Sequence, residues 1–212
     1  DLMASRLVLA LDETDPVRAL SIAREVSPFV AKIKINYPLV LSAGLEIVTE
    51  ISKFSNVICD FKVADIPNTN RLITEAVFNA GASGIIAHAF PGPESLKSIR
   101  DVDPEKDLYV VITMSHPKGG QFFNIEEFCS LALEIGATGV VAPATRPDDI
   151  VKVRKLVGNL EIISPGVGVQ GGNSQETLNA GADFIIVGRG IYLSDNPIEA
   201  AKKYSTDFTI DD

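Results

Sequence analysis

Short apolar runs rich in β-branched residues alternate along this chain with longer segments in which apolar residues recur at helical spacing. Eight of these runs predict strands, over residues 6–12, 30–36, 56–62, 83–89, 107–114, 138–144, 161–166 and 183–190. The intervening segments and the last segment predict helices near residues 15–27, 38–53, 68–80, 93–100, 124–136, 147–158, 173–180 and 196–204. The chain therefore reads as a repeated strand–helix unit.

The order and spacing of these elements predict the fold. The strands are apolar on both faces, which is typical of a parallel sheet covered by helices. Eight strand–helix units in 212 residues fit an α/β protein, a single-domain (β/α)8 TIM barrel over residues 1–212. Asp15-Pro16 and Asn196-Pro197 are typical helix starts, and Gly81 and Gly181 are typical of helix ends. An open doubly wound sheet is the alternative.

Composition and charge limit the partners and sites that this protein can have. The net charge of -9, from 19 Lys and Arg against 28 Asp and Glu, disfavours nucleic acid and anionic membrane as partners. No secretory signal pattern or membrane-length apolar run is visible. Cys59 and Cys129 lie in apolar surroundings, so we expect reduced, buried thiols in a cytoplasmic protein. Two histidines and no C-x-x-C pattern predict no metal site.

Charged residues gather where the predicted strands end. Asp12 ends the first strand, Lys34 lies near the end of the second, and the third ends in the D-x-K-x-x-D pattern of Asp60, Lys62 and Asp65. Barrel active sites lie at this edge, and residues two apart on a strand share a face. We therefore expect an acid–base site here. A purely structural ion-pair network at the barrel mouth is the alternative.

Glycines mark a second candidate site. The segment 166–171, GVGVQG, matches the dinucleotide-binding G-x-G-x-x-G pattern, but it follows the seventh strand instead of the first. In a barrel, the loops after strands seven and eight commonly bind phosphate. Residues 166–172 and 188–190 are those loops, with backbone N–H groups and Arg189 as candidate ligands. The alternative is that the glycines only form tight turns.

Ser115-His116 follows the fifth strand without a nucleophile elbow around it. We therefore expect Ser115 to bind substrate and His116 to be a structural loop residue. His88, on the fourth strand, is expected to be packed and hydrogen-bonded. The segment 115–124, SHPKGGQFFN, is a candidate lid or interface loop.

Five segments together resemble the orotidine 5′-monophosphate (OMP) decarboxylase family, and its short archaeal-type members most. They are IKINYPLVLSAG, CDFKVADIPNTN, MSHP, ISPGVGVQGG and IVGRGIYLSDNP, and the resemblance runs from about Arg6 to Ala201. It implies a homodimeric barrel enzyme that converts OMP to UMP in pyrimidine biosynthesis. It also implies that no metal or organic cofactor takes part.

The resemblance implies roles for individual residues. Asp60, Lys62 and Asp65 match the family's catalytic motif, and Lys34 matches the lysine that completes a Lys–Asp–Lys–Asp array. The residues that would come from the other subunit are Asp65, Ile66 and Thr69.

The same comparison implies a set of substrate-binding residues. Asp12 matches a ribose-binding aspartate, and Ser115 matches a serine that contacts the pyrimidine. The remaining substrate-binding positions are Lys34, Ile66, Thr69, Pro165, Val167, Gln170, Gly188 and Arg189, with Gln170 and Arg189 as the phosphate pair. Asn36 departs from the pattern, which has glycine there.

Two other functions remain open. A Mg²⁺-dependent sugar-phosphate decarboxylase or aldolase of the same superfamily shares the D-x-K-x-x-D motif and the phosphate loops. Lys34, the MSHP segment and Gln170 disfavour it, because a second lysine would repel a bound cation. A non-catalytic phosphate-binding barrel is disfavoured by the charged array, since a binder has no need of buried like charges.

Overall fold

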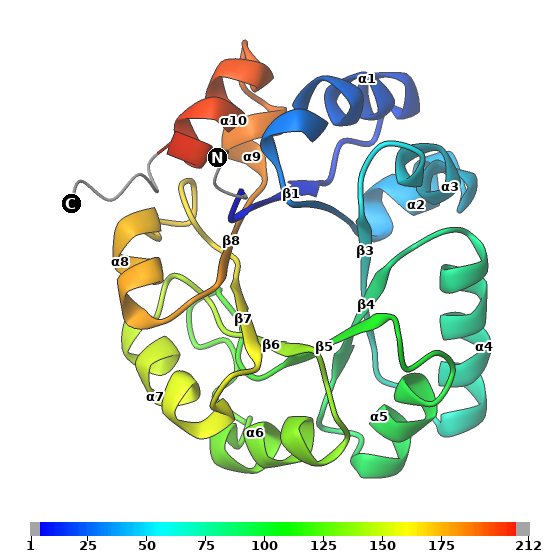
Figure 1. The fold of residues 1–212 in the computed structure, drawn as a ribbon, viewed down its shortest axis with the longest axis vertical. Helices are drawn as coiled ribbons and strands as arrows, with labels where there is room; N and C mark the ends of the chain where they lie inside the picture. The colour runs from blue at the N-terminus through cyan, green and yellow to red at the C-terminus, as the bar shows by residue number, and fades with distance from the viewer. Residues whose placement is uncertain (1–4, 207–212) are drawn as a thin grey trace.

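The computed structural model describes residues 5–206 as a closed barrel of eight strands in sequential order, each hydrogen-bonded in parallel to its neighbours (Figure 1). The barrel is complete because β1 pairs with both β2 and β8. The strands are β1 (Leu7–Leu11), β2 (Lys32–Ile35), β3 (Val57–Val63), β4 (Gly84–His88), β5 (Asp107–Val111), β6 (Gly139–Val141), β7 (Glu161–Ser164) and β8 (Phe184–Val187). This confirms the predicted barrel and excludes the open sheet.

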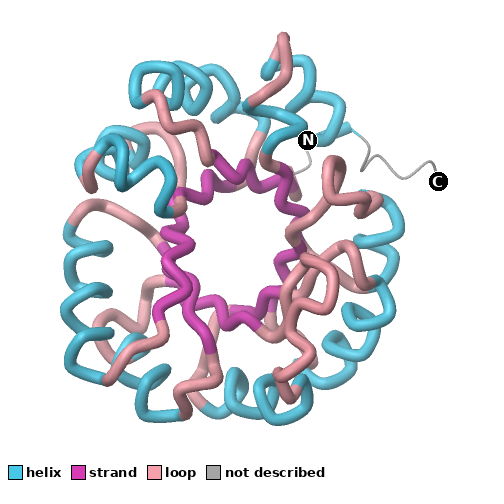
Figure 2. Tube along the Cα trace, turned by 180° about the vertical axis from the view of Figure 1, so that it is seen from behind, coloured by secondary structure: helices cyan, strands magenta, loops and turns pink. Residues whose placement is uncertain are grey.

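Helices form a ring outside the strands, and Figure 2 shows the two layers from the other side. They are α1 (Pro16–Val26), α2 (Tyr37–Ala43), α3 (Glu46–Ser52), α4 (Pro67–Asn79), α5 (Pro93–Arg100), α6 (Ile125–Glu134), α7 (Pro147–Val157), α8 (Ser174–Ala180), α9 (Arg189–Tyr192) and α10 (Pro197–Thr206), with a short 3₁₀ helix η1 (Ser27–Phe29). None of the helices in this described part is long and apolar enough to cross a membrane.

The predicted helix over 38–53 is wrong in one respect, because it is two helices. Gly44 has a φ of +81° and ends α2, a conformation that an L side chain rarely adopts. The short helix α9 was not predicted either. The predicted helix start at Asp15 is confirmed, since its side chain accepts hydrogen bonds from the N–H groups of Val17 and Arg18.

Two apolar clusters account for the packing. The larger lies between the strands and the helices, and the smaller consists of inward-facing strand residues such as Val8, Ile58 and Ile86. Strand β2 shows the alternation: Ile33 and Ile35 belong to the outer cluster. Its two lysines therefore point into the barrel. Both predicted buried thiols are confirmed as buried and free cysteines.

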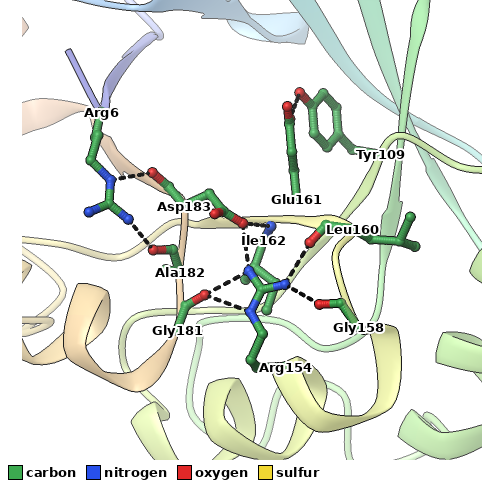
Figure 3. A network of polar contacts seen from close by, with 10 residues as sticks. All are labelled: Arg6, Tyr109, Arg154, Gly158, Leu160, Glu161, Ile162, Gly181, Ala182 and Asp183. Carbon is green, nitrogen blue, oxygen red and sulfur yellow. Dashed lines mark hydrogen bonds and ion pairs between the residues drawn. The ribbon is translucent and has the colours of Figure 1, made fainter. Parts of the chain in front are cut away.

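The first of these lysines, Lys32, begins β2 and lies at the amino ends of the strands. Its Nζ donates to the Tyr109 hydroxyl at 2.9 Å and to Asp107 at 3.2 Å. The fully buried Tyr109 donates in turn to Glu161 at 2.5 Å (Figure 3). This chain of bonds satisfies a partly buried cation and a buried hydroxyl inside the barrel.

A second part of this polar network links β7, α7 and β8. Arg154 pairs with Asp183 at 2.6 Å, and the same Asp183 oxygen accepts from the Ile162 N–H (Figure 3). Arg154 also donates to the carbonyls of Gly158, Leu160 and Gly181. The guanidinium therefore holds together backbone turns at the amino ends of two strands.

We predict that Tyr109→Phe lowers the free energy of unfolding by roughly 1–3 kcal/mol, because Glu161 loses a buried donor and Lys32 loses an acceptor. Urea denaturation measures this loss. Activity per folded molecule should be unchanged, since barrel active sites lie at the opposite end of the strands. A variant as stable as the wild type would show that the network contributes nothing.

Candidate active site

Three charged side chains meet at the carboxyl ends of β2 and β3. Lys34 Nζ lies 2.7 Å from Asp60 Oδ2, and Lys62 Nζ lies 2.9 Å from both Asp60 oxygens. Lys34 and Asp60 are 6% and 3% exposed, whereas the Lys62 side chain is 33% exposed. One buried carboxylate therefore holds two ammonium groups, and only one of these reaches toward solvent.

The local backbone explains how Lys62 returns to Asp60. The sequence predicts a regular strand here, but pairing with β4 shifts: Cys59 pairs with Ile85 and Val63 with Ala87. Lys62 has a φ of +43°, a left-handed conformation that is rare for a lysine. The shared direction of the two side chains thus comes from an irregular strand instead of simple alternation.

Tyr37, at the start of α2, lies against this irregular turn. Its hydroxyl donates to the Phe61 carbonyl at 2.8 Å, and the two rings stack at 4.9 Å. Backbone strain persists only where neighbouring structure holds it. Tyr37 therefore helps to fix the backbone immediately before Lys62, and the sequence alone gave no sign of this contact.

The pKa values of Asp60 and Lys34 follow from their pairing. Burial alone would raise the pKa of Asp60, but Lys34 and Lys62 together lower it below its usual value. Burial alone would lower the pKa of Lys34, but Asp60 and Asp12 together raise it. The ionised Asp60 therefore stabilises the folded state at pH values above the pKa that this carboxyl has in the unfolded chain. The charged Lys34 stabilises the folded state at pH values below the pKa that this amine has in the unfolded chain. Both Asp60 and Lys34 are therefore charged at neutral pH.

A cavity of about 170 Å³ opens above the triad. Its lining includes Lys34, Asp60 and Lys62 on one side and Ser115, Pro165 and Gln170 on the other. Apolar side chains of the barrel interior form its floor, namely Ile86, Val111, Val141 and Ile186. The cavity therefore presents charged, polar and apolar groups to a ligand.

A second cavity of about 120 Å³ adjoins the first, since both are lined by Lys34, Pro165, Gln170 and Ile186. The residues found only in the second are Ala10, Asp12, Gly166, Val167, Val169, Gly188 and Arg189. Asp12 Oδ1 is buried without a hydrogen-bond partner among residues 5–206. A buried acceptor left unpaired in this way is suited to a ligand hydroxyl.

The loop over residues 166–172 does not offer its amides as freely as the sequence suggested. The N–H groups of Gly168, Gly171 and Gly172 donate to carbonyls within the loop, at 2.8–3.0 Å. Gly166 has a φ of +92°, and a methyl group there would lie 3.1 Å from Gln170 Oε1. The loop is therefore a self-bonded turn that presents the Gln170 side chain.

Three predicted site residues lie away from both cavities. Asp65, Ile66 and Thr69 lie on the β3–α4 loop and the first turn of α4, where Ile66 is 64% exposed. Asp65 accepts from the Ile66 N–H at 2.6 Å and makes no ion pair in the described chain. Every other predicted site residue lines one of the two cavities.

The loop after β5 is held by residues that the sequence did not indicate. Thr145 donates to the Ser115 carbonyl at 2.9 Å, and Arg146 donates to the His116 carbonyl at 2.6 Å. His116 thus participates through its backbone, as a structural loop residue does. The sequence did offer one signal for Thr145 and Arg146, since both follow β6 at the carboxyl end of the barrel, where barrel active sites lie.

His88 ends β4 close to the triad. It is 9% exposed and packs against Phe90 and Phe123, the latter from the 115–124 loop. The prediction of packing is confirmed, but the expected hydrogen bond is not found at Nδ1, which is buried without a partner among the described residues. Burial, helped by the positive charge of Lys62, lowers the pKa of His88 to about 4.

Fold and site together define a (β/α)8-barrel enzyme with an acid–base cluster at its carboxyl mouth. The chain belongs to the orotidine 5′-phosphate decarboxylase / HUMPS family, whose model matches residues 5–204.

Individual relatives agree with the family match. The chain is 58% identical to the orotidine 5′-phosphate decarboxylase of Methanococcoides burtonii, over 94% of this chain and 95% of that protein. It is 44% identical to that of Pyrococcus furiosus, over 93% and 94%. A crystal structure of orotidine 5′-monophosphate decarboxylase from Methanocaldococcus jannaschii, complexed with the inhibitor BMP, superposes with a TM-score of 0.92 at 42% identity and covers 98% of this chain and 100% of that one.

We predict that the His88 imidazole stays neutral until the pH falls to about 4, as its NMR titration would show. Because the unfolded state takes up this proton near its ordinary pKa of about 6.5, the free energy of unfolding should fall as the pH drops from about 6.5 toward 4. His88→Gln should flatten this part of the stability profile. A titration midpoint near 6.5 in the folded protein would contradict the assignment.

Proposed function

We propose that this chain is an orotidine 5′-monophosphate decarboxylase, which converts OMP to UMP and CO₂ in pyrimidine biosynthesis. The observation that carries the proposal is the Lys34–Asp60–Lys62 triad, with its buried carboxylate, beside two adjoining cavities. Support comes from the relatives of the same name, which match nearly the whole chain. The family match and the barrel fold fit an enzyme of this class.

The reaction requires charge stabilisation at one carbon. Loss of CO₂ from C6 of the pyrimidine leaves an electron pair in the ring plane, where no carbonyl can delocalise it. A preorganised cation beside C6 stabilises this pair, and a proton must then be delivered to it. Lys62 serves both roles, since its ammonium is held at 2.9 Å from Asp60 and lines the cavity. After transfer, the neutral amine regains its proton from solvent.

Asp60 acts through its charge. Its carboxylate holds the ammonium groups of Lys34 and Lys62 in place, and its charge favours the protonated form of Lys34. Its place beside the cavity also sets it against the substrate carboxylate, whose loss relieves the repulsion. Lys34 lines both cavities, and it binds the substrate at the point where its base and ribose meet.

The remaining residues orient the substrate. The pyrimidine lies in the larger cavity against Ser115 and Pro165, and the ribose hydroxyls meet the unpaired oxygen of Asp12. The phosphate lies in the smaller cavity. Its ligands are Gln170, Arg189 and the backbone of Gly188, with Val167 as an apolar wall. Binding energy from the distant phosphate then helps to hold C6 at Lys62.

The active unit is a homodimer in a cytoplasmic setting. Each chain is one domain over residues 1–212, of which residues 1–4 and 207–212 lie outside the described part. Asp65, Ile66 and Thr69 complete the site of the other subunit. The exposure of Asp65 and Ile66, and the absence of an ion pair between Asp65 and Lys62 in the described chain, support this arrangement. Asp65 would then supply the last charge of a Lys–Asp–Lys–Asp array.

The alternative is a Mg²⁺-dependent sugar-phosphate decarboxylase or aldolase of the same superfamily. A metal at this site would have to sit beside Asp60, whose two oxygens are both engaged by lysines. Two ammonium groups this close repel a divalent cation. The proposal therefore requires neither a metal nor an organic cofactor.

We predict that the purified protein removes the absorbance of OMP and forms UMP, and that activity survives exhaustive EDTA treatment. Lys62→Ala should lower kcat/KM by more than about 10⁴-fold, because one group both stabilises and protonates the carbanion. Lys53→Ala is the matched control, since Lys53 is exposed and pairs with Glu50, away from both cavities. No turnover by the wild type would refute the proposal, and loss with EDTA that Mg²⁺ restores would favour the alternative.

We predict that Arg189→Ala acts through the phosphate. It should lower kcat/KM for OMP by roughly 10- to 100-fold, because one charge-assisted contact is lost. Turnover of orotidine, which lacks the phosphate, should change by less than about twofold. Equal losses on both substrates would assign Arg189 a different role.

We predict that two inactive variants restore activity together. Lys62→Ala and Asp65→Ala are unfolded, mixed in equal amounts and refolded. About half of the dimers are then mixed, and in each of these one site carries both changes and the other carries neither. About a quarter of wild-type activity should return. No recovery, with wild-type protein regaining activity after the same treatment, would place Asp65 in the site of its own chain.

A further inference from the structure

The last helix of the barrel reaches the two loops around the smaller cavity through one side chain. Tyr204, on α10, places its hydroxyl against Gly168 in the β7–α8 loop and against Gly190 in α9. A methyl group added to either glycine would lie 2.8 Å from this oxygen, which is closer than real side chains approach. The two glycines therefore leave room for one and the same hydroxyl.

The sequence neighbours of these glycines are the two side chains of the phosphate pair. Gln170 lies two residues after Gly168, and Arg189 directly precedes Gly190. Both line the smaller cavity. The Tyr204 hydroxyl thus lies between the two segments whose separation determines how Gln170 and Arg189 face a common anion.

Helix α10 is itself fixed to the body of the barrel. Ser205 donates to the Phe29 carbonyl in η1 at 2.7 Å, and Ala201 is completely buried. Tyr204 packs against the outer apolar cluster. A side chain held on an anchored helix can set the position of the loops it touches, because packed interiors resist changes in volume.

We propose that Tyr204 is a positioning residue for phosphate recognition, whose aromatic side chain sets the spacing between the β7–α8 loop and α9. The proposal rests on the function proposed above. It makes the carboxyl-terminal helix part of the machinery that selects a phosphorylated substrate, without any contact between Tyr204 and the substrate.

The geometry supplies a compensating pair of substitutions. Gly190 does not have a positive φ, so Gly190→Ala tests space alone, whereas Gly168 has a φ of +87° and would add strain. With the Tyr204 hydroxyl removed, the nearest atoms to the new methyl group are ring carbons at 3.5 Å, an ordinary contact. Tyr204→Phe should therefore relieve the clash that Gly190→Ala creates.

The test compares kcat/KM for OMP and for orotidine in Tyr204→Phe, Gly190→Ala, the double variant and Tyr204→Ala. We expect Gly190→Ala and Tyr204→Ala to lose about tenfold or more on OMP and less than about twofold on orotidine. Tyr204→Phe should lose less than about threefold, and the double variant should return to that level. A merely structural role would lower the melting temperature and affect both substrates equally.

A double variant no better than Gly190→Ala, or equal losses on the two substrates, would overturn the proposal. Turnover of OMP by the wild type tests the proposed function separately, so the two failures are distinguishable. If the wild type does not turn over OMP, the role of Tyr204 is tested by NMR titration of the same proteins with inorganic phosphate. Weaker binding in Gly190→Ala that Tyr204→Phe restores would support the role of Tyr204, and equal binding in all of them would refute it.

Discussion

The Asp60 carboxylate, buried between two ammonium groups, is the constraint on which the carboxyl mouth of this barrel depends. A buried carboxylate without partners costs several kcal/mol, and removing one partner of a buried pair is typically destabilising by about 3–5 kcal/mol. The positions of the Lys34 and Lys62 ammonium groups therefore depend on Asp60, and the ionised form of Asp60 depends on them. The irregular end of β3 serves this pairing, because the left-handed backbone at Lys62 lets its ammonium return to Asp60.

The two ends of the barrel differ in how their polar groups are paired. At the amino ends, Lys32, Tyr109 and Arg154 have their polar groups engaged within the fold, and the network contains no cavity-lining residue of the mouth. At the carboxyl ends, buried polar atoms are left open, as at Asp12 and His88. Unsatisfied groups of this kind lower stability, and they concentrate where a ligand can complete them.

Sequence reasoning predicted the barrel because eight repeats of one pattern outweigh errors at single boundaries. It also placed most site residues, since strand ends converge in any parallel barrel. It missed the bulge at Lys62, because the supporting Tyr37–Phe61 contact joins segments that no local pattern relates. It overestimated the free amides of the 166–172 loop, because the residue types do not show that these N–H groups bond to carbonyls of the same loop. The break at Gly44 could have been read from the glycine itself.

The measurement that tests the central claim most directly is the turnover of OMP by Asp60→Asn, which keeps the shape of the side chain and removes its charge. The account predicts that kcat/KM falls by more than about 10³-fold while the barrel remains folded by circular dichroism and UMP still binds, because both lysines lose the charge that aims them. A loss of less than about tenfold would show that the triad is a structural ion-pair network and that the chemistry does not depend on it.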